Sequence, residues 1–212
     1  MVEYLNLKTI KNKLYVQTVI NNMWQISASH VPVLVYLTKQ YDFKNILEIG
    51  SGELSTSLFL DKNIFKHLQA LTSVEENSEW LQKTQQAHKD DTRFTITDKV
   101  PVNLYHYDFI FIDGPQDEDR RAKMIQYVTR NTLPSMVVIH DMENRKYIKA
   151  VNYNNFNEFI FDPVSEPATG VYSKDILPTQ TFKKVNRFMR KHYNDIQESW
   201  NEWSTLFDDF NK

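Results

Sequence analysis

Two of the four glycines in this 212-residue chain stand together in the segment EIGSG at positions 48–52. At average usage a chain of this length would contain about fifteen glycines, so glycine is used here where the backbone requires it. A strand that turns through Gly-x-Gly into a helix lets a ligand approach bare backbone beside a helix N-terminus, although the same pattern also occurs in plain tight turns. The segment predicts a cofactor loop with Gly50, Ser51 and Gly52 as its contacts.

Acidic residues lie at the ends of two predicted strands near this loop. Glu48 precedes Gly50, so its carboxylate could face the ammonium group of a ligand that contains an amino acid. Glu75 ends the next apolar run, where an acid can accept hydrogen bonds from both ribose hydroxyls. Ser55 stands where a dinucleotide-binding fingerprint has its third small residue, so that fingerprint is matched only in part. The pattern favours a zwitterionic ligand with a ribose over a pyrophosphate.

Two further predicted strands end in polar side chains. Asp113 follows the apolar run FIFI at 109–112, and His140 and Asp141 follow the apolar run at 136–139. Ligands of open α/β sheets bind at the carboxyl ends of the strands, so His140 is a candidate base that removes a proton from an acceptor. Alternatively, Asp113 and Asp141 hold Mg²⁺, which acidifies a substrate hydroxyl. Both aspartates also have a structural alternative, because aspartate commonly caps turns and helices.

Arginine and aromatic side chains provide further candidates for substrate contact. Arg120, Arg121 and Arg145 follow the two strand ends. They either orient an anionic substrate through forked hydrogen bonds or form solvated charges and structural ion pairs. Three aromatic residues are candidates for an acceptor pocket, with a place in the core as the alternative: Trp24, Tyr105 and Tyr172. The remaining histidines show no metal-ligand spacing and receive no role: His30, His67, His88, His106 and His192.

The chain alternates short apolar runs with longer amphipathic ones, which is typical of βαβ units. Strands are predicted at 45–49, 71–75, 93–97, 108–112, 136–140, 158–161 and 170–173. The intervals between the first five are long enough for crossover helices, for example at 78–88 and 119–130, so these strands should be parallel. Pro163 and Pro167 separate the last two, which favours a hairpin at the sheet edge. We predict an α/β fold, a Rossmann-like, doubly wound, mostly parallel seven-stranded sheet with helices on both faces.

Helical segments at both ends divide the chain into three predicted parts. Residues 1–42 form a helical cap over the sheet edge or pocket, with Ser29 as a helix cap, and residues 43–178 form the cofactor-binding core. Residues 179–212 form one long amphipathic helix, in which apolar residues recur at an average spacing of about 3.5. Its first half is basic and its second half acidic. This helix either packs on its own domain or pairs with a second copy in a homodimer.

Composition limits the partners and the location. A formal net charge of -2 gives no general attraction to nucleic acid or an anionic membrane, so neither is expected as a partner. The absence of cysteine excludes disulfides and thiolate metal sites. The apolar runs are shorter than the roughly 20 residues that span a bilayer, and charged residues interrupt the N-terminal segment. We therefore expect a soluble, cytoplasmic protein.

Four stretches of the chain resemble the class I S-adenosylmethionine-dependent methyltransferases, in particular a bacterial group of small-molecule and glycan O-methyltransferases. They lie at 46–56, 73–80, 108–115 and 137–145. The resemblance implies S-adenosylmethionine as the cofactor. Its methionine part would lie on Glu48, Gly50 and Gly52, its ribose on Glu75, and its adenine near Thr97 and Asp98. Asp113 is predicted to border the cofactor as well.

Two positions depart from the family pattern. Leu54 stands where many relatives have a third glycine, and Met142 stands where the metal-dependent members have asparagine. We predict transfer of a methyl group to an oxygen of a small molecule or glycan by in-line displacement. Two alternatives stay open. One is an NAD(P)-dependent oxidoreductase on the same sheet, and the other is a non-catalytic methyltransferase-like subunit that assembles through its C-terminal helix.

Overall fold

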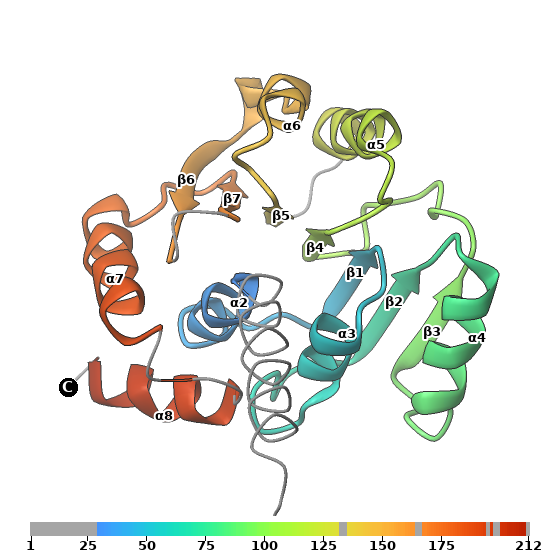
Figure 1. Ribbon diagram of the computed structural model, residues 1–212, viewed down its shortest axis with the longest axis horizontal. Helices are drawn as coiled ribbons and strands as arrows, with labels where there is room; N and C mark the ends of the chain where they lie inside the picture. Colours follow the sequence, from blue (N-terminus) through green and yellow to red (C-terminus); the bar gives the residue numbers. More distant parts are fainter. Residues whose placement is uncertain (1–28, 132–134, 164–166, 194–195, 197–199, 211–212) are drawn as a thin grey trace, which may run out of the picture.

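The computed structural model describes residues 29–131, 135–163, 167–193, 196 and 200–210 (Figure 1). Its centre is a seven-stranded sheet with the strand order β3-β2-β1-β4-β5-β7-β6. The strands are β1 (Asn45–Ile49), β2 (Ala70–Val74), β3 (Phe94–Thr97), β4 (Phe109–Ile112), β5 (Met136–His140), β6 (Asn157–Phe161) and β7 (Thr169–Ser173). The first five are parallel, and β7 pairs antiparallel with both β5 and β6. The predicted fold class is confirmed, including the antiparallel pair at one edge.

Helices cover both faces of this sheet (Figure 1). One layer contains α2 (His30–Thr38), α3 (Glu53–Leu60), α7 (Thr179–His192) and α8 (Trp200–Phe210), and the other contains α5 (Glu118–Asn131) and α6 (Arg145–Ala150). The helix α4 (Ser78–Ala87) packs beside β3. Every residue of β4 and β5 is buried, as expected for parallel strands covered on both faces. Among the described residues, no helix has the length and apolar character needed to cross a membrane.

Side-chain alternation along β1 assigns its residues to two separate cores. Ile46 belongs to the core under α2 and α3, whereas Leu47 and Ile49 belong to the core under α5 and α6. Because successive side chains of a strand point to opposite faces, Glu48 lies on the same face as Ile46. This placement decides what the Glu48 carboxylate can contact.

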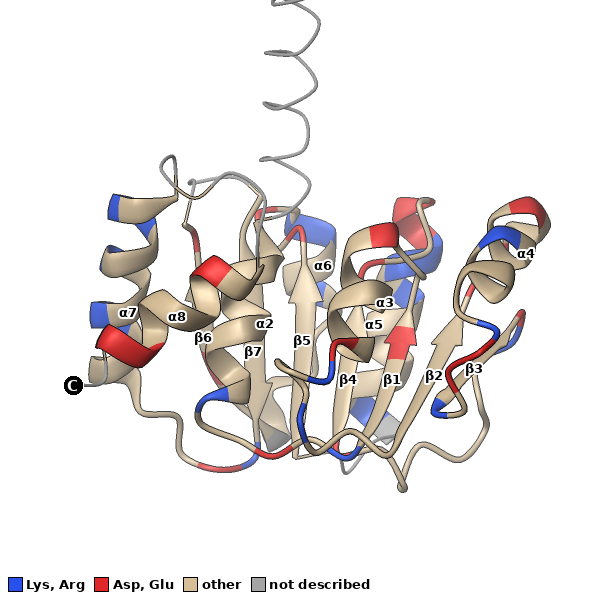
Figure 2. Cartoon of the chain, turned by 90° about the horizontal axis from the view of Figure 1, so that it is seen from below, with Lys and Arg blue, Asp and Glu red and all other residues tan. Residues whose placement is uncertain are grey.

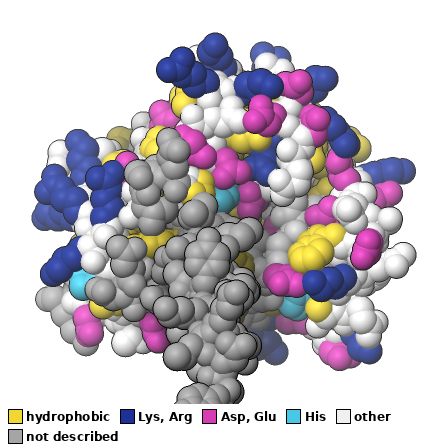
Figure 3. All heavy atoms as spheres, viewed as in Figure 1, with side chains coloured by type: hydrophobic (Ala, Val, Ile, Leu, Met, Phe, Trp, Pro, Cys, Tyr) yellow, Lys and Arg dark blue, Asp and Glu magenta, His cyan; other side chains and the backbone are white. Residues whose placement is uncertain are grey.

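The C-terminal region is helical as predicted, but it forms two helices instead of one long one. Phe182 of α7 is buried against Phe159 of β6, and Phe207 of α8 is buried against Tyr36 of α2. The apolar stripe at 3.5-residue spacing is therefore buried within the chain. Figure 2 shows the charge segregation that the sequence indicated, with basic residues on α7 and acidic residues on α8. The basic side chains of α7 gather at the left edge of the molecule in Figure 3. The homodimer stays a prediction.

The helix α2 is buried along nearly its whole length, in the layer that also contains α3. It was predicted as part of a cap over the edge or pocket, but its apolar residues belong to the main core. Lys39, just after α2, forms an ion pair with Asp208 of α8, with 2.8 Å between Nζ and Oδ1. Residues 1–28, which include the predicted pocket residue Trp24, lie outside the described residues.

The buried position of α8 gives a first prediction. Phe207→Ala should lower the free energy of unfolding by about 3–5 kcal/mol, because the truncation leaves a cavity between α8 and α2. The exposed Glu202→Ala on the same helix is the matched control and should change it by less than about 0.5 kcal/mol. Denaturant unfolding measures both. Equal stability of the two variants would contradict the packing of α8 on its own chain.

Candidate functional site

The Gly-x-Gly loop lies in direct backbone contact with the loop that follows β4. Gly50 has a φ of 89°, a conformation that favours glycine. A Cβ atom placed on Gly50 would lie 2.5 Å from the backbone N of Gly114, and one placed on Gly114 would lie 2.6 Å from Cα of Gly50. Both positions therefore require glycine. Because Asp113 directly precedes Gly114, this contact places Asp113 beside the Gly-x-Gly loop.

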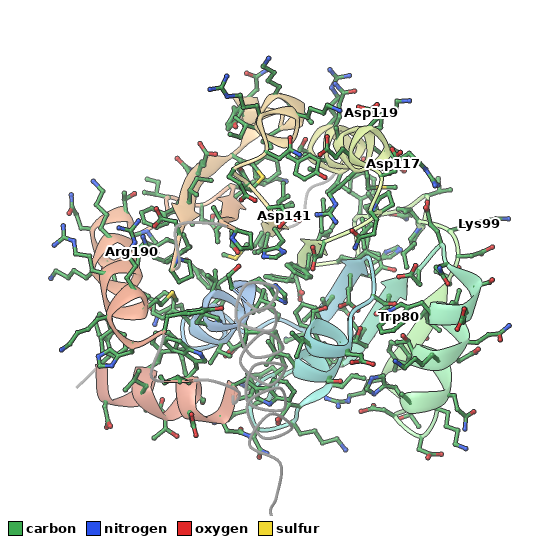
Figure 4. All side chains as sticks on the ribbon, in the orientation of Figure 1. Trp80, Lys99, Asp117, Asp119, Asp141 and Arg190 are labelled. Atoms are coloured by element: carbon green, nitrogen blue, oxygen red, sulfur yellow. The ribbon has the colours of Figure 1, made fainter. Side chains whose placement is uncertain are left out.

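A cavity of about 590 Å³ opens at this edge of the sheet. Five segments line it, namely the Gly-x-Gly loop, the end of β2 with the start of α4, the segment after β3, the loop after β4, and the first two turns of α5. A hydrogen bond joins the Gly-x-Gly loop to α4, since the Trp80 indole N–H donates to the carbonyl of Ser51 at 2.8 Å. Figure 4 shows Trp80 reaching in from α4. The volume suits a ligand of nucleoside size.

Five of the predicted cofactor residues line this cavity: Gly50, Ser51, Gly52, Glu75 and Asp113. Glu75 lies just after β2, and two contacts hold its carboxylate. Its Oε1 accepts the backbone N–H of Asn77 at 2.8 Å, and its Oε2 accepts the Ser51 hydroxyl at 3.3 Å. The fixed carboxylate retains further acceptor positions for ligand hydroxyls. Trp80 was not singled out as a contact in the sequence, although it ends one of the stretches that resemble methyltransferases.

The expectation that Glu48 faces a ligand ammonium group is not met. Glu48 is fully buried under α3, where its carboxylate accepts hydrogen bonds from Ser55 at 2.6 Å, Thr56 at 2.7 Å and Ser73. It does not line the cavity. Because side chains alternate along β1, Glu48 points to the opposite face from Leu47 and Ile49. From that face it contacts α3 and β2 and so fixes the start of the helix that follows the loop. Burial raises the pKa of Glu48 to about 7, although the three hydroxyl donors oppose the rise.

Asp98 also lies away from the cavity. It borders a separate hollow beyond the end of β3, together with Thr97 and Ser78. The predicted adenine contact at Asp98 therefore has no support from the lining of the cavity. The residue on this side that does line the cavity is Val100.

A buried polar cluster adjoins the cavity at Asp113. His140 Nδ1 lies 3.1 Å from Asp113 Oδ1, and His140 Nε2 lies 3.0 Å from the hydroxyl of Ser29. Ser29 was predicted as a helix cap, but its side chain makes no capping hydrogen bond to α2 and contacts His140 instead. His140 itself is 4% exposed and does not line the cavity. Asp113 is thus the residue that joins the cluster to the cavity.

Arg121 holds both aspartates of this cluster. Its guanidinium lies 2.6 Å from Asp141 Oδ2 and 3.5 Å from Asp113 Oδ1, and it donates to the backbone carbonyls of Asp113 and Pro115. Arg121 is 2% exposed, so it forms a structural ion pair. A guanidinium contacting both carboxylates takes the place that a shared Mg²⁺ would need, so Asp113 and Asp141 do not fit a magnesium site.

Asp141 adopts a φ of 60°, which is strained for a residue other than glycine. Figure 4 places it near the centre of the molecule, at the end of β5. The alternative that Asp141 caps the next helix is wrong, because Asn144 caps α6 through a hydrogen bond from the backbone N–H of Lys146. The side chain of Asp141 instead faces Arg121 and His140.

The charges of the cluster shift two pKa values in opposite directions. Burial alone would lower the pKa of His140, but the neighbouring Asp113 and Asp141 carboxylates raise it above the ordinary value. Burial alone would raise the pKa of Asp113, but His140 and Arg121 lower it below the ordinary value. Asp113 is therefore a carboxylate at neutral pH.

His30, which received no role from the sequence, lies inside this cluster. Its ring centroid is 4.6 Å from that of His140 and 5.2 Å from that of Phe111. Neither ring nitrogen has a hydrogen-bond partner among the described residues. Burial, with the adjacent His140, lowers the pKa of His30 to about 3, so the ring is neutral. No local pattern marks His30, because its neighbours come from β4 and β5.

The remaining arginine and aromatic candidates for substrate contact lie in three different places: the cavity, the surface and the core. Arg120 lines the cavity and pairs with Glu76, at 2.5 Å, whereas Arg145 is exposed on α6. Tyr105 is also exposed. Tyr172 belongs to the core, where its hydroxyl donates to Glu158.

Comparison with known proteins identifies the fold. No family model matches the chain, and no curated protein matches its sequence. Among solved structures, the methyltransferase domain of bacterial CtHen1 is similar, with a TM-score of 0.55, 14% identity, and coverage of 70% of this chain and 99% of that one. A putative caffeoyl-CoA O-methyltransferase from Staphylococcus aureus gives a TM-score of 0.52 and 16% identity, over 68% of this chain and 82% of that one.

A third similar structure is the N-methyltransferase NodS from Bradyrhizobium japonicum in complex with S-adenosylhomocysteine, with a TM-score of 0.51 and 13% identity. The match covers 68% of this chain and 84% of that one. The neighbours thus include proteins described as O- and N-methyltransferases. The chain has the fold of the class I S-adenosylmethionine-dependent methyltransferases, as the resemblance implied.

The buried Glu48 carboxylate predicts a pH dependence of stability. Because its pKa is raised in the folded chain, its stabilisation is complete below the unfolded pKa of ~4.3 and is lost as the pH rises through about 7. Glu48→Gln removes this titration. Between about pH 4.5 and about pH 8, the stability of wild type relative to Glu48→Gln should fall by roughly 3 kcal/mol. Denaturant unfolding across this range measures it, and parallel curves for the two proteins would contradict the assignment.

Proposed function

We propose that this chain is an S-adenosylmethionine-dependent methyltransferase. The observation that carries the proposal is that the Gly50–Gly52 loop and the Glu75 carboxylate line one cavity at the carboxyl ends of β1 and β2. Open α/β sheets bind ligands at this position, and an acid after the second strand suits ribose hydroxyls. The class I methyltransferase fold supports the same cofactor.

The residues of the cavity fit the parts of this cofactor. Gly52 caps α3 without a side chain, so the backbone N–H groups and the helix dipole can attract the carboxylate of the methionine part. Glu75, held by Ser51 and Asn77, would accept the ribose hydroxyls. Val100 would lie beside the adenine. When bound, the cofactor supplies an electrophilic methyl group on a sulfonium.

Asp113 is the group we propose for proton removal from the acceptor. It lines the cavity, and His140 and Arg121 keep it ionised. His140 was the base predicted from sequence, but both its ring nitrogens already face other side chains and it does not line the cavity. We therefore assign His140, and Asp141 through Arg121, to positioning Asp113. A carboxylate next to the cofactor site can accept the proton of a hydroxyl during in-line methyl transfer.

The acceptor we propose is a hydroxyl of a small molecule or glycan. Its support is the ionised Asp113 at the cavity wall, together with the sequence resemblance to O-methyltransferases. The segment that follows β4 is Asp113-Gly114-Pro115, and no Asn-Pro-Pro-Tyr-like element for an amino-base substrate stands there. The cytoplasmic location stays a prediction.

Cofactor binding can be tested without knowledge of the acceptor. Calorimetric titration with S-adenosylhomocysteine should give micromolar affinity, and NAD should not bind. Glu75→Ala should weaken binding by about 10- to 100-fold, because it removes charge-assisted hydrogen bonds to the ribose. Gly52→Arg should abolish binding by filling the loop face of the cavity.

The exposed Glu79→Ala, on the first turn of α4, is the matched charge control and should bind as wild type does. Unchanged affinity in both Glu75→Ala and Gly52→Arg would contradict the proposed function. Tighter binding of NAD than of S-adenosylhomocysteine would favour an oxidoreductase.

Asp113→Asn should separate binding from chemistry. Because the amide cannot accept a proton efficiently, transfer of labelled methyl from S-adenosylmethionine to a panel of phenols, sugars and other alcohols should fall at least ~100-fold. S-adenosylhomocysteine should still bind within about 3-fold of wild type, since the loop and Glu75 are intact. Thermal unfolding checks that the variant is folded. Full transfer activity in Asp113→Asn would exclude Asp113 as the proton acceptor.

A further inference from the structure

His30 presents two buried nitrogen atoms with no hydrogen-bond partner among the described residues. The side chain is 3% exposed and stands at the first turn of α2, against the ring of His140. Leaving a buried polar group unpaired costs folding free energy, so such groups usually have a bound water, an ion or a functional role. An apolar side chain at this position would avoid that cost. The geometry around His30 therefore needs an explanation beyond packing.

Three side chains place potential metal-ligand atoms close together here. One ring nitrogen of His30, one of His140 and one carboxylate oxygen of Asp113 all lie within 4.8 Å of one another. His140 Nδ1 and Asp113 Oδ1 are already only 3.1 Å apart. Ligand atoms at 2.0–2.2 Å from a tetrahedral zinc ion are about 3.4 Å apart, so the widest pair would have to approach by at most about 1.4 Å. Rotation of the imidazole rings can supply such a change.

We propose that His30, His140 and Asp113 form a binding site for one divalent first-row metal ion. Zn²⁺ is the ion used below to judge the geometry and to test binding. Two imidazoles and one carboxylate suit Zn²⁺, Fe²⁺ and Co²⁺, whereas Mg²⁺ prefers oxygen ligands alone. The site differs from the magnesium pair predicted from sequence, because it omits Asp141 and gains two histidines, His30 from α2 and His140 from β5.

The contacts around the three ligands leave lone pairs for a cation. Neither ring nitrogen of His30 has a hydrogen-bond partner among the described residues, so its lone pair is not engaged. An ion between His140 Nδ1 and Asp113 Oδ1 would take the place of the hydrogen bond that joins them. Arg121 lies closer to Asp141, at 2.6 Å, than to Asp113, at 3.5 Å, so Asp141 is its main carboxylate partner. Asp113 is the more weakly held of the two carboxylates.

The position of the site indicates what the ion would do. Its ligands come from α2, β4 with its following loop, and β5, so the ion would tie the helix layer to two central strands. Three protein ligands leave at least one coordination position open. Asp113 is the ligand that also lines the cavity, so the metal site would adjoin the cofactor site. The metal site does not depend on the proposed methyl transfer, because with the ion bound Asp113 would be a ligand and not the free proton acceptor.

The chain is well suited to a direct binding test, because it contains no cysteine and thiolate binding is excluded. Untagged protein treated with chelator should bind one equivalent of Zn²⁺ or Co²⁺ by calorimetry, with micromolar or tighter affinity. Bound metal should raise the melting temperature, since it binds the folded state alone. Mg²⁺ at the same concentration should do neither. Absence of stoichiometric Zn²⁺ and Co²⁺ binding by protein that binds S-adenosylhomocysteine would overturn the metal site and leave the proposed function standing.

Two variants make the test specific. His30→Leu removes one ligand and the unpaired polar atoms together, so it should stay folded without metal and should lose at least ~100-fold in Zn²⁺ affinity. His88→Leu, at a partly buried histidine that packs on Phe94, is the matched control and should bind Zn²⁺ as wild type does. Equal Zn²⁺ affinity in His30→Leu and wild type would contradict the proposal. If the leucine variant fails to fold, His30→Gln serves instead, with the same expected loss.

Discussion

The backbone contact between Gly50 and Gly114 is the constraint on which the rest of the site depends. The two loops approach so closely that neither position has room for a Cβ atom. This approach sets the ends of β1 and β4 side by side, as the parallel pairing of the two strands requires. It also places Asp113 at the wall of the cavity that the Gly-x-Gly loop lines. A ligand on the loop would therefore have a carboxylate beside it.

Two layers of polar residues support this contact from opposite sides. Below the loop, the buried Glu48 carboxylate binds three hydroxyls from α3 and β2, which fixes the helix that starts after Gly52. Behind Asp113, His140 and Arg121 fix the carboxylate and keep it charged. Ser29 and His30 extend that arrangement into α2. The two glycines thus determine the shape of the cavity, and the buried polar contacts fix the groups that line it.

Sequence patterns predicted the fold well, since continuous apolar runs and long intervals between them are local signals. Seven strands were predicted with ends within one residue of the observed ones, and the loop residues and Glu75 line one cavity, where cofactor binding stays a prediction. The direction of Glu48 was wrong, because alternation along β1 does not reveal which face α3 covers. The single C-terminal helix was also wrong, because no proline or glycine marks the break between α7 and α8.

The buried cluster could not be predicted from local pattern. Ser29 and His140 are 111 residues apart in sequence, and only the packing of α2 beside β5 brings them together. His30 reads locally as one more residue of an apolar helix. Asp141 has a positive φ, and nothing in the neighbouring sequence predicts this backbone conformation. Such contacts arise from tertiary packing, which periodicity does not encode.

A crystal structure of the chain with S-adenosylhomocysteine would show directly whether the cavity holds the cofactor. We expect the ribose hydroxyls to lie within hydrogen-bonding distance of the Glu75 carboxylate and the homocysteine part to lie on the Gly50–Gly52 backbone beside Asp113. A ligand bound elsewhere, with this cavity filled by solvent, would contradict this expectation.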